Sequence, residues 1–306
     1  MKIFVTGGSG FIGRYTVVAL LKAGNSVTIY DNQYNSSKTT VRYLIEKGAK
    51  FVKGDITNYK QISRSISGFD AVVHLAAQID VQESIRDPLF THHVNTTGTL
   101  NLLNACIENN VKNIVAASTA AVYGESAKQS ISENSPVNPI SPYGVSKLSM
   151  EFYLKVFSSY HDLNCVSLRF FNVYGAGQSD AYAGVITKFV DCIQKNKSLV
   201  IFGNGSNTRD FVSVSDAVSA IQLALEKIKG KKGNCYNIAS GKYTTIKDLA
   251  YTMISISRKP LQIKYQKARK GDIRKSQPTI LLAKKELGYR PKIDLQDGLQ
   301  ELIKAI

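Results

Sequence analysis

Cysteine is scarce in this chain of 306 residues, and its spacing excludes two kinds of stabilising site. Structural zinc sites use closely paired cysteines, and disulfide frameworks are typical of short, cysteine-rich chains. The four cysteines form no C-x-x-C pair and lie far apart, at Cys106, Cys165, Cys192 and Cys235. We therefore predict four reduced cysteines in the core and no metal site.

Long apolar runs, internal repeats and low-complexity tracts are also missing. No apolar stretch approaches the roughly 20 residues that span a membrane, so we expect no membrane partner. A core strand is predicted to start at residue 2, which leaves no room for a signal peptide, and a cytoplasmic location is the expectation. With 43% hydrophobic residues, the chain can bury the core of one large α/β unit, with or without a smaller lobe.

Acidic residues are few, with 23 Asp and Glu against 39 Lys and Arg, which gives a formal net charge of +16. Such a surface raises the local concentration of anions, and both acidic nucleotides and nucleic acids qualify. The densest basic cluster, residues 264–275, lacks the repeated aromatic side chains that stack on bases. We therefore predict a solvated basic surface and no specific nucleic-acid partner.

The first thirteen residues, MKIFVTGGSGFIG, combine a predicted strand with a glycine-rich turn. Residues 2–6 form a short apolar run, and the apolar periodicity of residues 15–22 is typical of a helix. Gly7, Gly10 and Gly13 fit G-x-x-G-x-x-G, and a G-x-G-x-x-G register begins at Gly8. Such a turn lets a pyrophosphate approach backbone N–H groups and the helix N-terminus. We predict a dinucleotide site here, with an ordinary strand–helix turn as the alternative.

An acidic residue, Asp31, follows the second predicted strand, residues 26–30. An acid about 20 residues beyond the glycines is placed to accept hydrogen bonds from a ribose diol. This favours NAD, because the 2′-phosphate of NADP would be repelled by the carboxylate. Arg14 and Lys38 are cations that could soften the repulsion, so NADP is not excluded.

The third predicted strand, residues 50–53, is followed by a second acidic position. In a doubly wound sheet the carboxyl end of this strand lies beside the adenine, so Asp55 and Ile56 are candidates to bond and cover that ring. An equal alternative for Asp55 is a cap on a helix over residues 58–65.

The fourth predicted strand lies within residues 69–78 and runs into small side chains, which let the backbone approach a cofactor. His74 ends its apolar stretch, and we predict a hydrogen-bonded core histidine there rather than a ligand. A long helix is predicted over residues 88–109, and a fifth strand over residues 113–118 opens into Thr119.

A Y-x-x-x-K motif, Tyr143 and Lys147, begins another predicted helix, with Ser141 as its N-cap and Pro142 in its first turn. A spacing of four residues places the phenol and the ammonium group on one face. We expect the cation to lower the tyrosine pKa toward neutrality, so that the phenolate acts as a general base. Thr119 or the preceding serine could share the proton.

Taken together, these motifs resemble those of the extended short-chain dehydrogenases/reductases, and most closely NAD-dependent nucleotide-sugar epimerases of the UDP-glucose 4-epimerase type. The resemblance runs nearly end to end. It implies an α/β fold: a Rossmann-type doubly wound parallel sheet with a smaller mixed α/β substrate lobe. The implied domains are an NAD-binding Rossmann domain of residues 1–171, to which 211–240 return, and a nucleotide-sugar-binding lobe of residues 172–210 and 241–306.

The motifs and the resemblance together assign three sets of site residues. The catalytic set is Thr119, Tyr143 and Lys147. The NAD-binding set is Gly7, Gly10, Phe11, Ile12, Gly13, Asp31, Asn32, Asp55, Ile56, Leu75, Ala76, Ala77, Asn95, Tyr143 and Lys147. The substrate set implied by the resemblance is Ser118, Thr119, Asn172, Phe202, Arg209, Arg269, Asp272 and Ser276. In that set the two arginines hold the diphosphate, and Phe202 lies beside the base.

The implied reaction is reversible inversion at C4 of a UDP-sugar, through transient oxidation by NAD. Related dehydratases and decarboxylases have an acid where this chain has Ala120 and Ala121. Ser276 is small, so the resemblance predicts acceptance of UDP-GlcNAc as well as UDP-glucose. A UDP-glucuronate 4-epimerase, an NAD(P)H-dependent sugar-nucleotide reductase and a non-catalytic NAD-binding regulator remain alternatives. The resemblance also implies a homodimer formed through residues 88–109 and 143–159.

Overall fold

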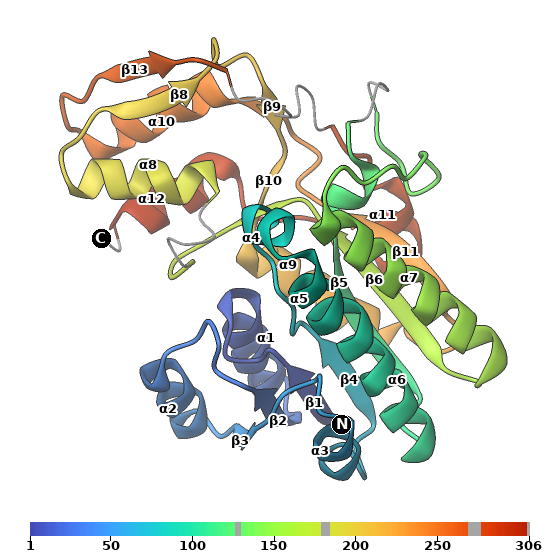
Figure 1. The fold of residues 1–306 in the computed structure, drawn as a ribbon. Helices are drawn as coiled ribbons and strands as arrows, with labels where there is room; N and C mark the ends of the chain where they lie inside the picture. The colour runs from blue at the N-terminus through green and yellow to red at the C-terminus, as the bar shows by residue number, and fades with distance from the viewer. Residues whose placement is uncertain (126–129, 179–183, 269–276, 305–306) are drawn as a thin grey trace.

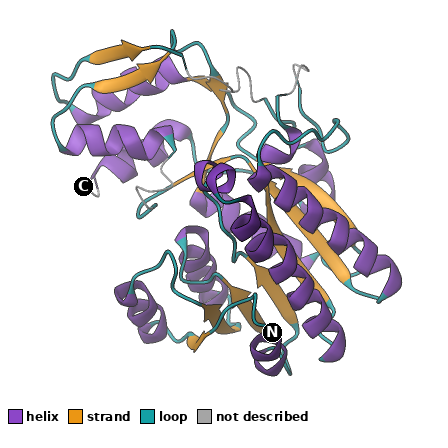
Figure 2. Cartoon of the chain, in the orientation of Figure 1, coloured by secondary structure: helices purple, strands orange, loops and turns teal. Residues whose placement is uncertain are grey.

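A seven-stranded sheet organises the larger part of the molecule, and a smaller group of helices and strands lies beside it (Figure 1). The computed structural model describes residues 1–125, 130–178, 184–268 and 277–304. Helices cover both faces of the large sheet, as Figure 2 shows by colour. None of the described helices has the length and apolar character needed to cross a membrane.

All neighbouring strands of the large sheet are parallel, in the order β11-β6-β5-β4-β1-β2-β3. Their bounds are β1 Lys2–Thr6, β2 Ser26–Asp31, β3 Lys50–Lys53, β4 Ala71–His74, β5 Asn113–Thr119, β6 Asn164–Phe170 and β11 Lys232–Ile238. The order reverses between β1 and β4, which is the switch point of a doubly wound sheet. The predicted Rossmann-type α/β fold is confirmed.

Two apolar cores fill the two faces of this sheet. The alternation of β1 places Ile3 and Val5 in the core with α1 and α9, and Phe4 in the core with α3, α6 and α7. The helices of this part are α1 Phe11–Lys22, α2 Lys38–Glu46, α3 Tyr59–Ser65, α4 Val81–Arg86, α5 Pro88–His92, α6 Gly98–Glu108, α7 Pro142–Tyr160, α9 Val214–Glu226 and α11 Leu281–Leu287. Because both faces are covered, the strands are almost continuously apolar.

The smaller group of elements has its own core, in which Phe189, Ile201 and Met253 are buried. Its helices are α8 Val185–Gln194, α10 Ile246–Ser257 and α12 Leu295–Lys304. Its strands form two-stranded pairs: β8 Leu199–Phe202 with β13 Ile263–Gln266, β9 Thr208–Arg209 with β12 Thr244–Thr245, and β7 Asn172–Tyr174 with β10 Phe211–Ser213. The β7–β10 pair leads from the large sheet toward this group (Figure 1).

The chain passes between the large sheet and the smaller group of elements more often than the predicted domain boundaries imply. Strand β11 forms an edge of the large sheet, as expected for residues 211–240. Helix α11 also packs on that sheet, since Ala283 and Leu287 are fully buried in its core. Assigning all of residues 241–306 to the smaller lobe was therefore wrong for α11, whose apolar face fits the larger core.

Two helix predictions need correction. Helix α1 begins at Phe11 rather than at residue 15, because Gly10 in extended conformation is its N-cap. The helix predicted over residues 88–109 is divided into α5, a π-helical turn at His93–Thr97 and α6. A π turn holds an extra residue per turn, and a sequence period of 3.6 does not reveal it. The Ser141 cap of α7 is confirmed, since its hydroxyl accepts a hydrogen bond from the Gly144 N–H at 3.1 Å.

Candidate active site

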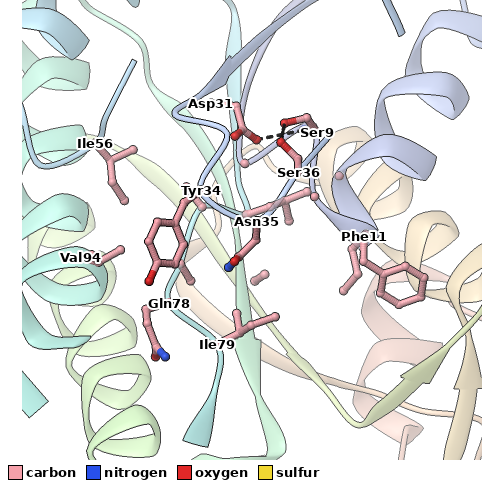
Figure 3. Close-up of a pocket in the computed structure, with 18 of the residues that line it drawn as sticks. Ser9, Phe11, Asp31, Tyr34, Asn35, Ser36, Ile56, Gln78, Ile79 and Val94 are labelled. Atoms are coloured by element: carbon pink, nitrogen blue, oxygen red, sulfur yellow. Dashed lines mark hydrogen bonds between the residues drawn. The ribbon is translucent and has the colours of Figure 1, made fainter. Parts of the chain in front are cut away.

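A cavity of about 700 Å³ opens along the carboxyl ends of β1, β2, β3, β4 and β5. It lies at the switch point of the sheet, where doubly wound folds bind their ligands. Its wall also includes the start of α7 and, from the segment after β6, Phe171, Val173, Gly177 and Gln178. Figure 3 shows part of this cavity, with Asp31, Tyr34 and Ile56 among the residues around it.

The glycine turn between β1 and α1 depends on two of its glycines. Gly7 has a φ of +68°, and a Cβ on it would lie 2.5 Å from the backbone nitrogen of Ala76. A Cβ on Gly13 would lie 2.2 Å from the carbonyl oxygen of Gly7. The G-x-x-G-x-x-G register therefore describes the turn. The first N–H groups of α1 have no intrahelical acceptors, and the residues at this end of the helix, Gly10, Phe11 and Ile12, line the cavity.

The carboxylate of Asp31 anchors the edge of the turn (Figure 3). It accepts hydrogen bonds from the backbone N–H of Ser9 at 3.0 Å and of Gln33 at 2.8 Å. Arg14, which we considered as a cation that could offset this charge, donates instead to the carbonyl oxygen of Ala176. Its guanidinium is thus held by the segment that follows β7, at the wall of the cavity.

Asp55 lies at the end of β3 and does not cap the next helix. Its carboxylate accepts from the Asn32 side chain at 2.8 Å, and from the N–H and hydroxyl of Thr57 at 2.8 and 2.7 Å. Burial alone would raise the pKa of Asp55, but these hydrogen bonds hold it below its ordinary value. Asn58 is the N-cap of α3, so the capping alternative for Asp55 was wrong. Asp55 and the buried Ile56 both line the cavity.

His74 is the hydrogen-bonded core histidine that we predicted. Its ring nitrogens pair with the hydroxyls of Thr6 at 2.8 Å and Thr99 at 3.1 Å. Burial, and then the charge of Lys147, lower the pKa of His74 to about 3. The imidazole is therefore neutral at physiological pH.

Asn95, which we predict to bind the cofactor, forms three side-chain hydrogen bonds within the protein. The amide oxygen accepts from the Gln78 N–H at 2.8 Å, and the amide nitrogen donates to the Gln78 carbonyl and the Ser146 hydroxyl at 2.8 and 2.9 Å. Asn95 is 2% exposed and does not line the cavity. It lies in the π turn and joins the loop after β4 to α7, so it supports the cavity wall, and its contact with the cofactor stays a prediction.

The Y-x-x-x-K pair faces the cavity together with the end of β5. The ammonium group of Lys147 donates to the carbonyl oxygen of Ala117 at 3.0 Å. Burial lowers the pKa of Lys147 to about 8, although the charge of Glu151 opposes this. Such a value near neutrality is typical of a group that takes part in proton transfer.

The pKa of Tyr143 differs from our expectation. Burial raises it to about 12, and this outweighs the lowering that a hydrogen bond with Thr119 produces. The prediction that the nearby Lys147 cation lowers the pKa of Tyr143 toward neutrality was therefore wrong. A positive charge beside the ring would favour the phenolate.

The predicted substrate residues fall into three groups. Ser118 and Thr119 line the cavity, but the Ser118 hydroxyl donates to the buried carboxylate of Glu151 and not to the cavity. Asn172, Phe202 and Arg209 lie on β7, β8 and β9 and are not part of the cavity wall; the Asn172 amide donates to the Asp210 carbonyl at 2.9 Å. Arg269, Asp272 and Ser276 lie outside the described residues.

Several residues that line the cavity were missed by the sequence analysis. They lie in the loop after Asp31 and in the loop after β4: Tyr34, Asn35, Ser36, Gln78 and Ile79 (Figure 3). The Ser36 hydroxyl bonds that of Ser9 in the glycine turn at 2.7 Å. Their position directly after a site residue was the available signal, because loops at the carboxyl ends of parallel strands form the ligand crevice.

Three comparisons with known proteins place these features in context. The sequence model of the family described as NAD dependent epimerase/dehydratase matches residues 3–239. The chain is 37% identical to a putative UDP-glucose 4-epimerase of Methanocaldococcus jannaschii, over 98% of this chain and 97% of the relative.

Two solved structures are similar over nearly the whole chain. A UDP-glucose 4-epimerase of Thermotoga maritima, solved with UDP-glucose, has a TM-score of 0.93 and 35% identity, and covers 99% of this chain and 98% of its own. A UDP-N-acetylglucosamine 4-epimerase of Methanobrevibacter ruminantium, in complex with UDP-N-acetylmuramic acid, has a TM-score of 0.93 and 34% identity, and covers 99% and 97%.

Proposed function

Because the chain belongs to the NAD dependent epimerase/dehydratase family, we propose that it is an NAD-dependent UDP-sugar 4-epimerase acting on UDP-glucose and UDP-galactose. One observation carries this proposal. Tyr143, Lys147 and Thr119 meet at the wall of a cavity whose other wall is a glycine turn with an acid at its edge. The full-length similarity to UDP-glucose 4-epimerases supports it.

The residues present fit the NAD cofactor of the family. The first turn of α1 offers N–H groups to a diphosphate, and Asp31 offers a carboxylate to a ribose diol. Asp55 and Ile56, which line the same cavity, would bond and cover the adenine. Bound NAD supplies a reversible hydride acceptor for C4 of the sugar, and its ring carries a positive charge.

Tyr143 is the proposed general base for the sugar O4. Burial holds its pKa at about 12, so the phenol becomes a useful base only when positive charge lies beside it. Lys147 provides one such charge, held in place by the Ala117 carbonyl. Thr119 hydrogen-bonds the phenol and passes the proton between Tyr143 and the sugar hydroxyl.

The substrate side of the site is proposed from the resemblance. Arg209 and Arg269 would hold the diphosphate while the sugar turns over, with Asn172 beside it, Phe202 at the base and Asp272 at the ribose. We assign nucleotide-sugar binding to residues 172–210 and 241–306 without α11, and NAD binding to residues 1–171 with 211–240. An arginine fork can grip two phosphate oxygens at once, which suits an anchor that must persist through the turnover.

Acceptance of UDP-GlcNAc is a second proposal. It rests on the small side chain of Ser276 and on the similarity to a UDP-N-acetylglucosamine 4-epimerase. The alternative is that the chain is a UDP-glucuronate 4-epimerase.

A homodimer is proposed through α7 and its neighbour α5. Val145, Phe152 and Val156 lie on one face of α7 and are each about half exposed, and Leu89 on α5 is 81% exposed. The two helices pack together, so these side chains form one apolar surface of the kind that marks subunit interfaces. A cytoplasmic location is proposed as well, because the reaction draws on NAD and nucleotide sugars.

The experiment that tests the function uses the purified protein without added cofactor. UDP-glucose, UDP-GlcNAc and UDP-glucuronate are each incubated with it, and the products are identified by NMR. We expect UDP-galactose from UDP-glucose with no net consumption of NAD or NADH. A product that forms only with stoichiometric NAD(P)H would identify a reductase, and NAD binding with no turnover of any sugar would identify a non-catalytic binder.

A further inference from the structure

Helix α7 is joined to the end of β5 by two contacts one helical turn apart. The Lys147 ammonium group donates to the carbonyl oxygen of Ala117 at 3.0 Å. Four residues further along the helix, the carboxylate of Glu151 accepts a hydrogen bond from the hydroxyl of Ser118. Residues four apart lie on one face of a helix, so Lys147 and Glu151 hydrogen-bond two consecutive residues of β5.

A third contact follows on the next strand residue. Thr119 hydrogen-bonds Tyr143, which lies one turn before Lys147 on the same helical face. The pattern on α7 is therefore Y-x-x-x-K-x-x-x-E, and all three side chains meet residues 117–119. Glu151 is the member of this row that does not line the cavity.

Glu151 is itself held rigidly. It is 4% exposed and forms a two-point ion pair with Arg169 of β6, at 2.6 and 2.9 Å. Arg169 also donates to the Tyr123 hydroxyl at 2.8 Å and the Glu133 carbonyl at 3.2 Å. A buried ion pair gives little net stability compared with apolar side chains of the same volume. Stability alone therefore does not account for the Glu151–Arg169 pair, whereas a positioning role does.

We propose that Glu151, held by Arg169, is a positioning residue of the reaction centre, which seats Ser118 and Thr119 against Tyr143 and keeps Lys147 charged. The inference rests on the proposed epimerase function, because it concerns the same proton-transfer site. Glu151 acts through Ser118 and Lys147, and does not itself line the cavity.

The titratable groups that face Lys147 and Glu151 lie on α7 itself and on three strands, β4, β6 and β11. Facing Lys147 are Tyr143 of its own helix and His74 of β4, which is neutral because burial lowers its pKa to about 3. Facing Glu151 are Arg169 of β6 and the Cys235 thiol of β11, 3.6 Å away, whose pKa burial raises to about 12. On β5 the neighbouring side chain is the neutral Ser118 hydroxyl.

Glu151 therefore supplies the negative charge that opposes the effect of burial on Lys147. Burial lowers the pKa of Lys147 to about 8, and Glu151 raises it. Without that charge the ammonium group is lost at a lower pH. A turnover that needs the ammonium group then declines at a lower pH too.

The test uses three variants and a matched control. Glu151→Gln removes the carboxylate charge, and Ser118→Ala removes the hydroxyl of β5 that donates to Glu151. The double variant Glu151→Leu with Arg169→Met replaces the buried ion pair by apolar side chains. The control is Glu286→Gln, because Glu286 also pairs with a lysine, Lys231 at 2.6 Å, but lies on α11 away from the cavity. For each protein, kcat, KM and the pH profile with UDP-glucose are measured together with Tm.

For Glu151→Gln we expect a loss of about tenfold or more in kcat at pH 8.5, with KM close to that of the unmodified protein and the alkaline limb of the pH profile at lower pH. Ser118→Ala lowers kcat but leaves that limb in place. The control keeps both kcat and the limb. If the ion pair were only structural, its loss would lower Tm and leave catalysis unchanged. A folded Glu151→Gln variant with normal kcat and an unmoved alkaline limb of the pH profile therefore overturns the proposal.

Two further measurements keep the test decisive. If Glu151→Gln does not fold, the apolar double variant takes its place, and full kcat in the double variant or in Ser118→Ala overturns the proposal. The titration of Lys147 is also followed by NMR of protein labelled with ¹³C at the lysine ε-carbon, with the signal assigned by Lys147→Arg. The titration midpoint of Lys147 must move to lower pH in Glu151→Gln. This measurement tests the proposal even if the protein turns over no UDP-sugar.

Discussion

The carboxylate of Asp31 accepts a hydrogen bond from the backbone N–H of Ser9 at 3.0 Å, and so connects the end of β2 to the glycine turn. The same carboxylate accepts the Gln33 N–H at 2.8 Å. In the proposed NAD site, this one side chain would shape the turn that receives the diphosphate and offer an acceptor to the ribose. Cofactor affinity and cofactor choice depend on the same residue.

Asp31→Asn should weaken NAD binding by about tenfold or more, because hydrogen bonds to charged groups contribute about 1.5–3 kcal/mol. NADP binding should suffer less, because the repulsion of its 2′-phosphate is removed. Calorimetric titration with both cofactors measures this. Asp70→Asn is the control, since Asp70 accepts the Lys2 N–H at 2.7 Å at the opposite end of β1. Equal losses for NAD and NADP would contradict the assignment.

Gly13→Ala should lose bound NAD and lower Tm, whereas Gly10→Ala should do so much less. A Cβ on Gly13 would lie 2.2 Å from the Gly7 carbonyl oxygen, but a Cβ on Gly10 would lie 3.3 Å from the same atom. Overpacking of this kind costs about 1–3 kcal/mol. The measurements are thermal unfolding and the NAD-to-protein ratio after purification, and equal effects of the two substitutions would refute the turn geometry.

Tyr143→Phe should lower kcat by a factor of about 10² to 10⁴, the usual contribution of a general base, while NAD binding is retained. Tyr160→Phe on the same helix is the control, because Tyr160 is 81% exposed and lies at the far end of α7. Turnover and NAD affinity are measured for both. Undiminished turnover in Tyr143→Phe would rule out the proposed base.

Asp210 should make stability depend on pH in a direction that is unusual for an acid. Burial raises its pKa from about 3.8 to about 6, although the carboxylate accepts hydrogen bonds from Ser240 and Gly241. Between these values the folded chain binds more protons than the unfolded chain. The stability from this group is thus complete below about pH 4 and lost as the pH rises through 6.

The variant Asp210→Asn isolates this effect. The free energy of unfolding of the unmodified protein, minus that of the variant, should fall from pH 4 to pH 7 by an amount of the order of 3 kcal/mol. Urea denaturation at each pH measures both values. A difference that stays constant over this range, or rises, is the contrary result.

Phe152→Glu should separate the proposed dimer, because it places a charge in the apolar surface of α7 and α5, where Phe152 is 55% exposed. Light scattering after size-exclusion chromatography measures the mass. Tyr43→Glu on α2 is the control, since Tyr43 is also about half exposed, at 46%, but lies on another helix. A monomeric unmodified protein, or a dimer that tolerates Phe152→Glu, would refute the interface.

Local patterns in the sequence were sufficient for much of the fold and for the centre of the site. The strand–glycine–helix start, Asp31 at the end of β2, and the capped helix that carries Tyr143 and Lys147 all follow from contacts between residues close in the chain. A period of two or 3.6 residues and a helix cap are set by such contacts, so they are visible without a structure.

Contacts between distant residues decided the rest. Asn95 forms hydrogen bonds with Gln78 and Ser146. The Ser118 hydroxyl donates to Glu151, 33 residues further along the chain. The pKa of Tyr143 follows from its burial and not from its spacing to Lys147. The sequence by itself determined which residue types reach the carboxyl edge of the sheet. Which of them face the cavity, and in what protonation state, was decided by tertiary packing, because desolvation and hydrogen bonding depend on neighbours that local periodicity does not specify.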